Sequence, residues 1–277
     1  MTNNIPESPI GIFDSGVGGL SVLKAIRSQL PEEEVIYLGD QGHVPYGPRP
    51  LDEVRGFSEE ITRFLLAGGA KLIIVACNSA SAAALPMLRD TFPQVSFVGM
   101  EPAIKPAAEL TRSRVIGVLA TPATFQGTLY ASALERYGQG VTVLESTVPG
   151  LVTQIEKGKL DAPKTEAILR EALLPMLERG ADTVVLGCTH YAFVIPLIRR
   201  IVGENVNIID PAPAIARRTV RLLQEEQLRR PAQEKAPVTY YTTGAAQAFD
   251  ELLPKLVGKE GEVKGLCWKE GKLGSAQ

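Results

Sequence analysis

Short apolar runs alternate with longer stretches of helical period along most of the chain. Between the runs, residues 20–30, 54–66, 165–177 and 214–228 carry apolar side chains three and four positions apart, which predicts amphipathic helices. Fully apolar strands alternating with helices predict an α/β fold whose mostly parallel sheets are covered on both faces. The predicted strands are residues 10–13, 35–38, 72–76, 95–98, 115–119, 141–144, 183–186, 206–209 and 238–242.

Two segments of the chain repeat each other without a gap. GAKLIIVACNSA (69–80) and GADTVVLGCTHY (180–191) share a Gly-Ala start and an apolar run, and Cys77 aligns with Cys188. A fainter pair aligns IGIFDSG from Ile10 with IGVLATP from Ile116, although βα units in general look enough alike to explain that pair. The repeat predicts two pseudo-symmetric α/β domains with the active site in the cleft between them.

Proline-rich segments indicate where the chain crosses between the two halves. Residues before proline resist helix, so Glu101-Pro102 and residues 210–213 (DPAP) are expected to be extended crossings. We therefore expect residues 1–99 together with 211–277 to form a discontinuous first α/β domain that contains Cys77. Residues 100–210 would form the second α/β domain, which contains Cys188.

Composition and charge exclude several classes of partner. The 29 basic and 31 acidic residues give a net charge of −2 and neither sign clusters, which argues against a nucleic-acid surface. No apolar run approaches the roughly 18 residues of a membrane span, and the first residues lack the pattern of a secretory signal. We therefore expect a cytoplasmic protein with no membrane partner. Its three cysteines would be reduced there, so each needs its own explanation.

Polar, reactive groups follow four of the predicted strands: Asp14-Ser15, Asp40, Cys77-Asn78-Ser79 and Cys188-Thr189-His190. In open α/β sheets, ligands bind beyond the carboxyl ends of the strands. We expect each of these ends to be followed by the start of a helix, whose free N–H groups favour anions and favour thiolate over thiol.

Each of these groups also has a structural explanation when taken alone. A lone cysteine is usually a small buried hydrophobe, which is the interpretation we give Cys267. Asn, Ser and Thr after a strand are often helix caps, and Asp14 and Ser15 could cap a helix that begins near Val17. Two cysteines in matching positions of two halves favour the functional interpretation.

Two facing thiols suit stereochemical inversion at a carbon atom. One thiol would remove a proton from one face while the other delivers a proton to the opposite face. Asp14 and His190 would hold the thiols or pass their protons. No arginine lies in these motifs, so an anionic substrate would be bound by Asn78, backbone N–H groups and the hydroxyls of Ser15, Ser79 and Thr189.

Four ordered blocks, FDSGVGGLSVL, YLGDQGHVPYGPR, VACNSASA and LGCTHY, resemble the signature blocks of glutamate racemase in the aspartate/glutamate racemase superfamily. The resemblance runs from residue 10 to about residue 250, including ATPATF and YYTTGAAQAF. It implies a cofactor-independent, metal-free isomerase that interconverts L- and D-glutamate and supplies D-glutamate for peptidoglycan. It also implies a homodimer.

The resemblance assigns roles residue by residue. Cys77 matches the cysteine that acts on the D-enantiomer and Cys188 the one that acts on the L-enantiomer. The matching substrate-binding positions are Asp14, Ser15, Tyr46, Gly47, Asn78, Ser79, Thr121, Thr189 and His190.

The chain departs from the family pattern at three places. Gln41-Gly42 replaces the small hydroxyl or alanine residues that are usual after GD in the family, which leaves the packing of that loop open. Val148-Pro149 stands where the family often has Cys-Pro, before a helix expected from about Leu151. A helper glutamate of some members would align with Glu156, although that block has drifted.

Other functions remain as alternatives. A nucleotide-dependent oxidoreductase is suggested by Gly16-x-Gly18 with Asp40 after the next strand, but Ser21 occupies the third glycine position. A two-lobed amino-acid binding protein would not need paired thiols. Among sister enzymes, an aspartate or hydantoin racemase stays open, because only the resemblance favours glutamate. Two cysteines argue against a decarboxylase that uses one.

Overall fold

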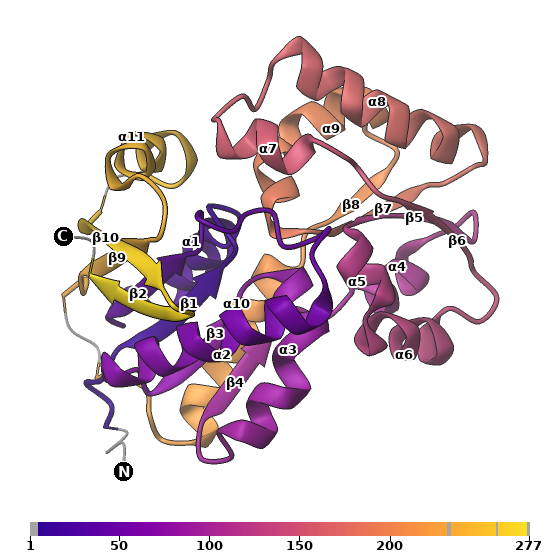
Figure 1. The fold of residues 1–277 in the computed structure, drawn as a ribbon. Helices are drawn as coiled ribbons and strands as arrows, with labels where there is room; N and C mark the ends of the chain where they lie inside the picture. Colours follow the sequence, from indigo (N-terminus) through magenta and orange to yellow (C-terminus); the bar gives the residue numbers. More distant parts are fainter. Residues whose placement is uncertain (1–4, 232–233, 259, 276–277) are drawn as a thin grey trace.

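The computed structural model describes residues 5–231, 234–258 and 260–275, which form two sheets with helices on both faces (Figure 1). Every strand pairing in them is parallel except the terminal antiparallel pair β10–β11. The first sheet contains β1 (Ile10–Asp14), β2 (Val35–Gly39), β3 (Leu72–Val75), β4 (Ser96–Gly99), β9 (Val238–Thr242), β10 (Glu262–Lys269) and β11 (Lys272–Ser275). The second contains β5 (Val115–Ala120), β6 (Thr142–Ser146), β7 (Thr183–Gly187) and β8 (Asn207–Ile209).

The two sheets repeat one strand order. The first runs β11-β10-β9-β2-β1-β3-β4 and the second runs β6-β5-β7-β8, so β2-β1-β3-β4 corresponds to β6-β5-β7-β8. Gly69 (φ +84°) and Gly180 (φ +85°) occupy the same left-handed turn before β3 and β7. The predicted α/β class with two pseudo-symmetric, mostly parallel sheets is confirmed.

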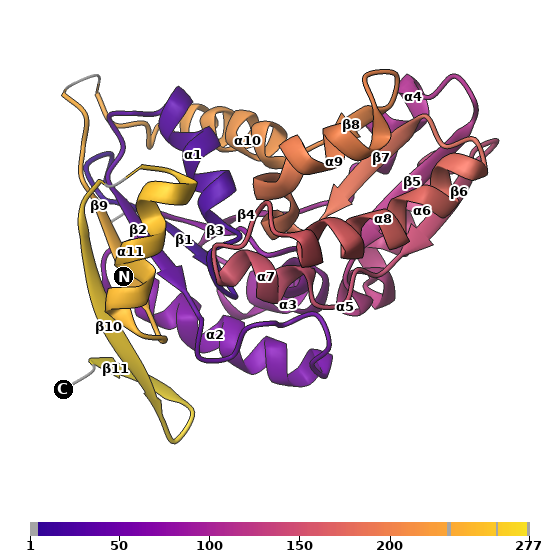
Figure 2. The same cartoon turned by 90° about the horizontal axis from the view of Figure 1, so that it is seen from above.

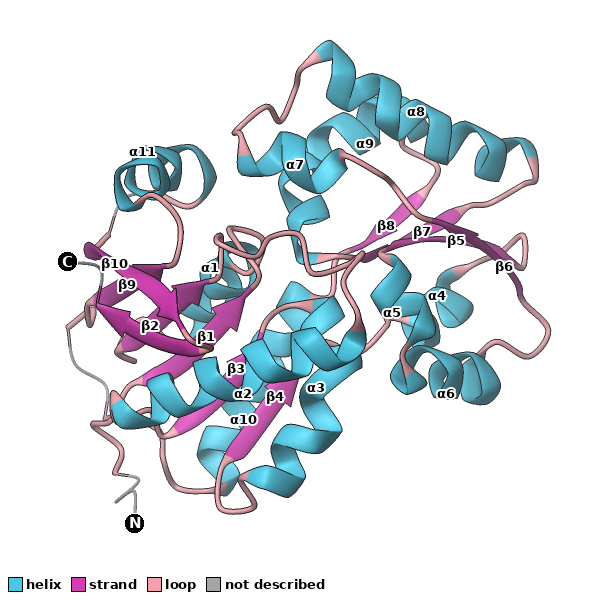
Figure 3. Ribbon diagram, in the orientation of Figure 1, coloured by secondary structure: helices cyan, strands magenta, loops and turns pink. Residues whose placement is uncertain are grey.

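Helices cover both faces of each sheet (Figure 3). On the first sheet, one face holds α1 (Leu20–Gln29), α10 (Ala212–Glu225) and α11 (Ala246–Leu256), and the other holds α2 (Leu51–Ala67) and α3 (Asn78–Thr91). On the second sheet, one face holds α7 (Leu151–Glu156), α8 (Pro163–Glu178), η1 (Thr189–Val194) and α9 (Ile195–Val202). The other face holds α4 (Ile104–Leu110), α5 (Pro122–Gln126) and α6 (Thr128–Tyr137). None of the described helices is long and apolar enough to span a membrane.

The apolar strands are explained by burial on both faces. In β3, Leu72 and Ile74 pack in the cluster that contains α1 and α10, whereas Ile73 and Val75 pack against α2 and α3. The first of these clusters also contains Leu186 of β7 and the buried residues of α8. One continuous apolar core therefore joins the two sheets on that side.

The C-terminal strands β10 and β11 were not predicted. β10 extends the first sheet beside β9, and β11 pairs with it at the edge (Figure 2). Only Leu266 of β10 is buried, and its other residues are exposed or half-buried. The run EVKGLCWK thus lacks the continuous apolar character by which the other strands were recognised.

The sequence had suggested that a helix starts directly after each of the four reactive strand ends. The structure shows this at only some of them. The α-helix α3 follows Cys77 directly, but only the short 3₁₀ helix η1 follows Cys188, and a loop of residues 41–50 separates Asp40 from α2. Prolines at positions 45, 48 and 50 oppose helix formation in that loop. Asp14 and Ser15 do not cap α1, which begins later, at Leu20, with Gly19 as its N-cap.

Candidate active site

A small cavity lies where the strand ends of the two sheets meet. Its volume of about 10 Å³ has room for about one water molecule. Every predicted site residue except Asp14 lines it. The lining residues are Ser15, Pro45, Tyr46, Gly47, Cys77, Asn78, Ser79, Thr121, Val152, Cys188, Thr189 and His190.

Cys77 lies at the carboxyl end of β3 and is the N-cap residue of α3. Its sulfur accepts a hydrogen bond from the Ala80 N–H (3.5 Å), and its thiol lies 3.8 Å from the Ser15 hydroxyl. Burial raises the pKa of Cys77, and the nearby charge of Asp14 raises it further, whereas the Ala80 N–H lowers it. The expectation that a helix start would lower this pKa is wrong, because loss of solvent outweighs one N–H donor. Cys77 is therefore held as a neutral thiol.

Cys188 has a different partner. Its sulfur lies 3.8 Å from Nδ1 of His190, and Nε2 of His190 lies 2.6 Å from Oε1 of Glu156. Burial by itself lowers the pKa of His190, but its hydrogen bonds to Cys188 and Glu156 raise it well above 6.5. This arrangement makes His190 an imidazolium ion beside the Cys188 sulfur.

Glu156, at the end of α7, is the carboxylate that pairs with His190. Burial raises the pKa of Glu156, yet hydrogen bonds from His190, Gln41 and the Val17 N–H lower it overall. The donors lie 2.6 to 2.8 Å from its oxygens. Glu156 was a weak candidate because the sequence around it departs from the family pattern. In the structure it contacts His190, which in turn contacts Cys188.

Asp14 is fully buried, hydrogen-bonds to Thr189 next to Cys188, and lies near enough to Cys77 for its charge to act there. Its Oδ1 accepts the Gly16 N–H (2.9 Å) and its Oδ2 accepts the Thr189 hydroxyl (3.0 Å). Burial raises the pKa of Asp14, while the charge of His190 lowers it. Asp14 thereby joins the end of β1 to the segment that follows β7.

The glycines after β1 make room for the acid–base groups. A Cβ atom at Gly16 would lie 1.9 Å from Oε1 of Glu156, and one at Gly18 would lie 2.3 Å from Nδ1 of His190. The Gly-x-Gly pattern that suggested a dinucleotide is thus explained by close approach of these side chains. The oxidoreductase alternative loses its main support.

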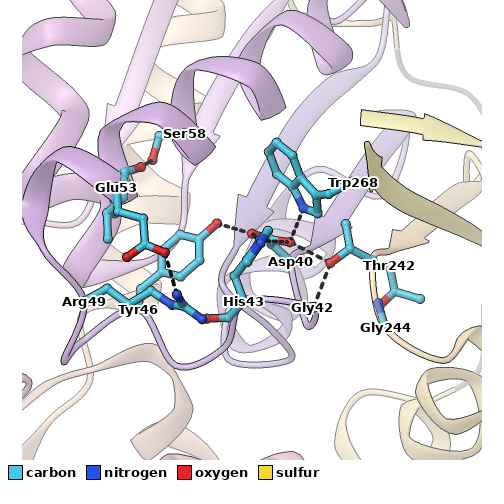
Figure 4. Close-up of polar contacts among 12 residues, drawn as sticks. Asp40, Gly42, His43, Tyr46, Arg49, Glu53, Ser58, Thr242, Gly244 and Trp268 are labelled. Carbon is cyan, nitrogen blue, oxygen red and sulfur yellow. Dashed lines mark hydrogen bonds and ion pairs between the residues drawn. The ribbon is translucent and has the colours of Figure 1, made fainter. Parts of the chain in front are cut away.

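Tyr46 and Gly47 reach the cavity from the loop after β2. The Tyr46 hydroxyl donates to the buried Asp40 carboxylate (2.5 Å), which also accepts from Trp268 Nε1 (2.8 Å). Figure 4 shows Tyr46, His43 and Trp268 converging on Asp40. The C-terminal strand β10 therefore helps to fix the loop that contains Tyr46.

The remaining lining residues form contacts across the two halves. The hydroxyls of Ser79, in α3, and Thr121, at the end of β5, lie 2.9 Å apart. The Oδ1 atom of Asn78 is buried and has no hydrogen-bond partner among the described residues. An unpaired buried acceptor of this kind is costly unless a ligand supplies the donor. No three His, Cys, Asp or Glu side chains in the described part of the chain are placed to hold a metal ion.

A larger cavity of about 270 Å³ adjoins the small one. The two share Gly47, Thr121, Val152 and Pro45 in their linings. The larger cavity is mainly apolar and includes the loop of residues 147–150.

Comparison with known proteins decides the family. Residues 10–219 match the family model of the Asp/Glu/hydantoin racemases. The chain is 50% identical over 249 residues to the glutamate racemase of Roseiflexus sp. (strain RS-1), a match that covers 90% of this chain and 92% of that one. The chain belongs to the glutamate racemase family.

Solved structures of the glutamate racemase family have the same fold. A glutamate racemase isoform from Bacillus anthracis superposes with a TM-score of 0.85 at 33% identity, covering 96% of this chain and 99% of that one. The Escherichia coli glutamate racemase, solved with L-glutamate and the activator UDP-MurNAc-ala, gives a TM-score of 0.82 at 31% identity, covering 94% and 98%.

Proposed function

We propose that this chain interconverts L- and D-glutamate without a cofactor, using Cys77 and Cys188 on opposite faces of Cα. The observation that supports this best is that two thiols from matching strands of a repeated fold line one small cavity. Glutamate as the substrate is supported by the similar glutamate racemases and by the E. coli relative solved with L-glutamate.

The two thiols begin in different states in this proposal. Cys77 is the proton donor, because burial raises its pKa. We assign Cys188 as the base, because His190 Nδ1 lies 3.8 Å from its sulfur and can exchange a proton with it. With this distribution the enzyme accepts L-glutamate, since Cys188 removes the Cα proton and Cys77 delivers one to the other face.

Substrate binding is assigned to the polar groups around the thiols. The unpaired Oδ1 of Asn78 would accept a hydrogen bond from the substrate ammonium group. The hydroxyls of Ser15, Ser79 and Thr121 would donate to its carboxylates, with Tyr46 and Gly47 forming the wall on the side of the β2 loop. The Thr189 hydroxyl, whose proton goes to Asp14, would accept from the substrate ammonium group. The small cavity has room for about one water molecule, which is far less than the volume of an amino acid. Its walls must therefore move apart before glutamate binds.

Asp14 and His190 support the thiols in this scheme. His190 passes a proton to and from Cys188, and Glu156 keeps the imidazole charged. Asp14 disfavours a second negative charge at Cys77 and orients the Thr189 hydroxyl.

The proposal extends to the place of the enzyme in the cell. The product D-glutamate would supply peptidoglycan synthesis and so cell-wall formation and cell shape, in the cytoplasm, with the enzyme acting as a homodimer. We also propose the domain limits 1–99 with 211–277, and 100–210. The division of the strands between two sheets supports them.

A chirality assay on a panel of amino acids tests the function. The purified protein, with no cofactor added, should racemise glutamate from either enantiomer and incorporate deuterium at Cα in D2O. Faster turnover of aspartate or of a hydantoin would replace the substrate assignment. Absence of Cα exchange with every substrate would contradict the proton-transfer mechanism.

A further inference from the structure

We propose that Gln41 is a positioning residue that holds the Glu156 carboxylate against His190 and joins this pair to strand β9. Gln41 is the residue at which the chain departs from the family pattern after GD. The inference rests on the proposed function, in which the His190–Glu156 pair serves Cys188.

Gln41 bridges two segments that are distant in sequence. Its Nε2 donates to Oε2 of Glu156 at 2.7 Å, and its Oε1 accepts from the Thr242 hydroxyl at 2.9 Å. Thr242 ends β9 and is fully buried. The side chain of Gln41 therefore connects the first sheet to the carboxylate at the end of α7.

The direction of these hydrogen bonds is determined by the Glu156 carboxylate and is compatible with the bonds at Thr242. The Gly244 N–H donates to the Thr242 hydroxyl oxygen (3.0 Å), which leaves the hydroxyl proton free to point at Gln41. The Glu156 carboxylate can only accept, so Gln41 must present its NH₂ group to Glu156 and its oxygen to Thr242. If the Gln41 amide turned over, its oxygen would face the Glu156 carboxylate and the bond to Glu156 would be lost.

The fixed Gln41 amide matters because the Glu156 carboxylate could otherwise rotate about its terminal C–C bond and move Oε1 away from His190. Oε1 of Glu156 accepts from His190 and Val17, and Gln41 is the donor to Oε2 among the described residues. With both oxygens held, the Oε1 atom stays in line with His190 Nε2. The other charged group that faces Glu156 is Asp14, from β1, which repels the carboxylate and increases the need for a donor.

The matched experiment compares Gln41→Leu with Gln247→Leu. Gln247 also donates to a glutamate carboxylate (Glu251, 3.0 Å), but on the exposed face of α11. Neither side chain lines the cavity. The chain has only two histidines, so nitrogen-15 NMR of the labelled protein can resolve the Nε2–H signal of His190. The His190→Asn variant assigns this signal, and the spectra are recorded without substrate.

We expect Gln41→Leu to broaden or abolish the His190 Nε2–H signal and to lower kcat roughly tenfold, with KM changed less than about twofold. Thr242→Val, which frees the Gln41 amide to turn, should act in the same direction but less, and Gln247→Leu should change neither readout. An unaltered His190 signal together with an unaltered kcat in Gln41→Leu would overturn the inference. If the wild-type protein racemises no glutamate, the proposed function fails, while the NMR comparison still decides whether Gln41 holds the pair.

Discussion

Nε2 of His190 lies 2.6 Å from Oε1 of Glu156, and both side chains are almost fully buried. His190 follows β7 and Glu156 ends α7, whereas the loops that enclose the pair, after β1 and β2, belong to the first sheet. The proton chemistry proposed for Cys188 therefore depends on contacts made by both halves of the molecule.

Replacing Glu156 by Gln should lower kcat at least about tenfold and destabilise the fold by about 2 kcal/mol, because His190 loses a charged, buried partner. Steady-state kinetics and denaturant unfolding at one pH measure the two effects. Gln247→Leu provides the surface control. Full activity in Glu156→Gln would show that His190 does not need a carboxylate.

The stability difference between wild type and Glu156→Gln should depend on pH in a defined way. The folded pKa of Glu156 lies below 4.5, so its contribution is present above pH 4.5 and is lost as the pH falls through the folded value. The folded pKa of His190 lies above 6.5, so its contribution is complete below pH 6.5 and is lost as the pH rises through the folded value. Unfolding measured from pH 3 to pH 10 should show the largest difference between pH 4.5 and 6.5.

Serine substitutions separate the roles of the two thiols. Cys77→Ser and Cys188→Ser should each lower racemisation by roughly 10²- to 10⁴-fold, because a serine hydroxyl is a far weaker acid at neutral pH. In D2O, Cys77→Ser should retain slow Cα exchange with L-glutamate only, and Cys188→Ser with D-glutamate only. Unimpaired turnover in either variant would refute the two-base assignment. Cys267→Ser, on β10, is the control.

A methyl group at Gly16 should impair catalysis without unfolding the protein. It would meet the end of the flexible Glu156 side chain, which can swing away from His190 while the backbone stays in place. Gly16→Ala should therefore lose about tenfold in kcat. Gly56→Ala, in α2 with no atom within 4 Å of its Cβ, should keep full activity and gain about 0.5–1 kcal/mol in stability.

Trp268→Phe should loosen the loop that contains Tyr46. The indole N–H donates to the buried Asp40 carboxylate, so its loss should cost about 1–2 kcal/mol of stability and reduce kcat/KM severalfold. Tyr46→Phe removes another donor to the same carboxylate. A double-mutant cycle should find the two changes non-additive, and strict additivity would mean that Asp40 does not couple them.

Much of the fold could be predicted from the sequence because burial on two faces leaves continuous apolar runs. Each predicted strand corresponds to one of β1–β9, and the repeat correctly indicated the shared strand order. The strands β10 and β11 escaped because only Leu266 of β10 is buried, so EVKGLCWK forms no continuous apolar run. A helix was expected directly after Asp40, as after the other three strand ends, although three prolines stand in that loop.

The candidate site was predictable where chemistry concentrated in short motifs, as at Cys77 and Cys188. It was less predictable where a contact joins distant segments. Glu156 lies 34 positions from His190, and Gln41 lies 115 positions from Glu156. No local pattern encodes such a pairing. The pKa of Cys77 was also predicted in the wrong direction, because a motif shows the helix start but not the loss of solvent around the sulfur.

The unequal surroundings of the two cysteines have a consequence for the catalytic cycle. Racemisation has an equilibrium constant of unity, but in the proposed two-thiol mechanism each turnover leaves the enzyme with its proton on the other sulfur. Ser15 beside Cys77 and His190 beside Cys188 make these two protonic forms unequal in free energy. The free enzyme must therefore reset its proton between identical turnovers, and at high substrate concentration this reset, rather than bond cleavage at Cα, can limit the rate in one direction.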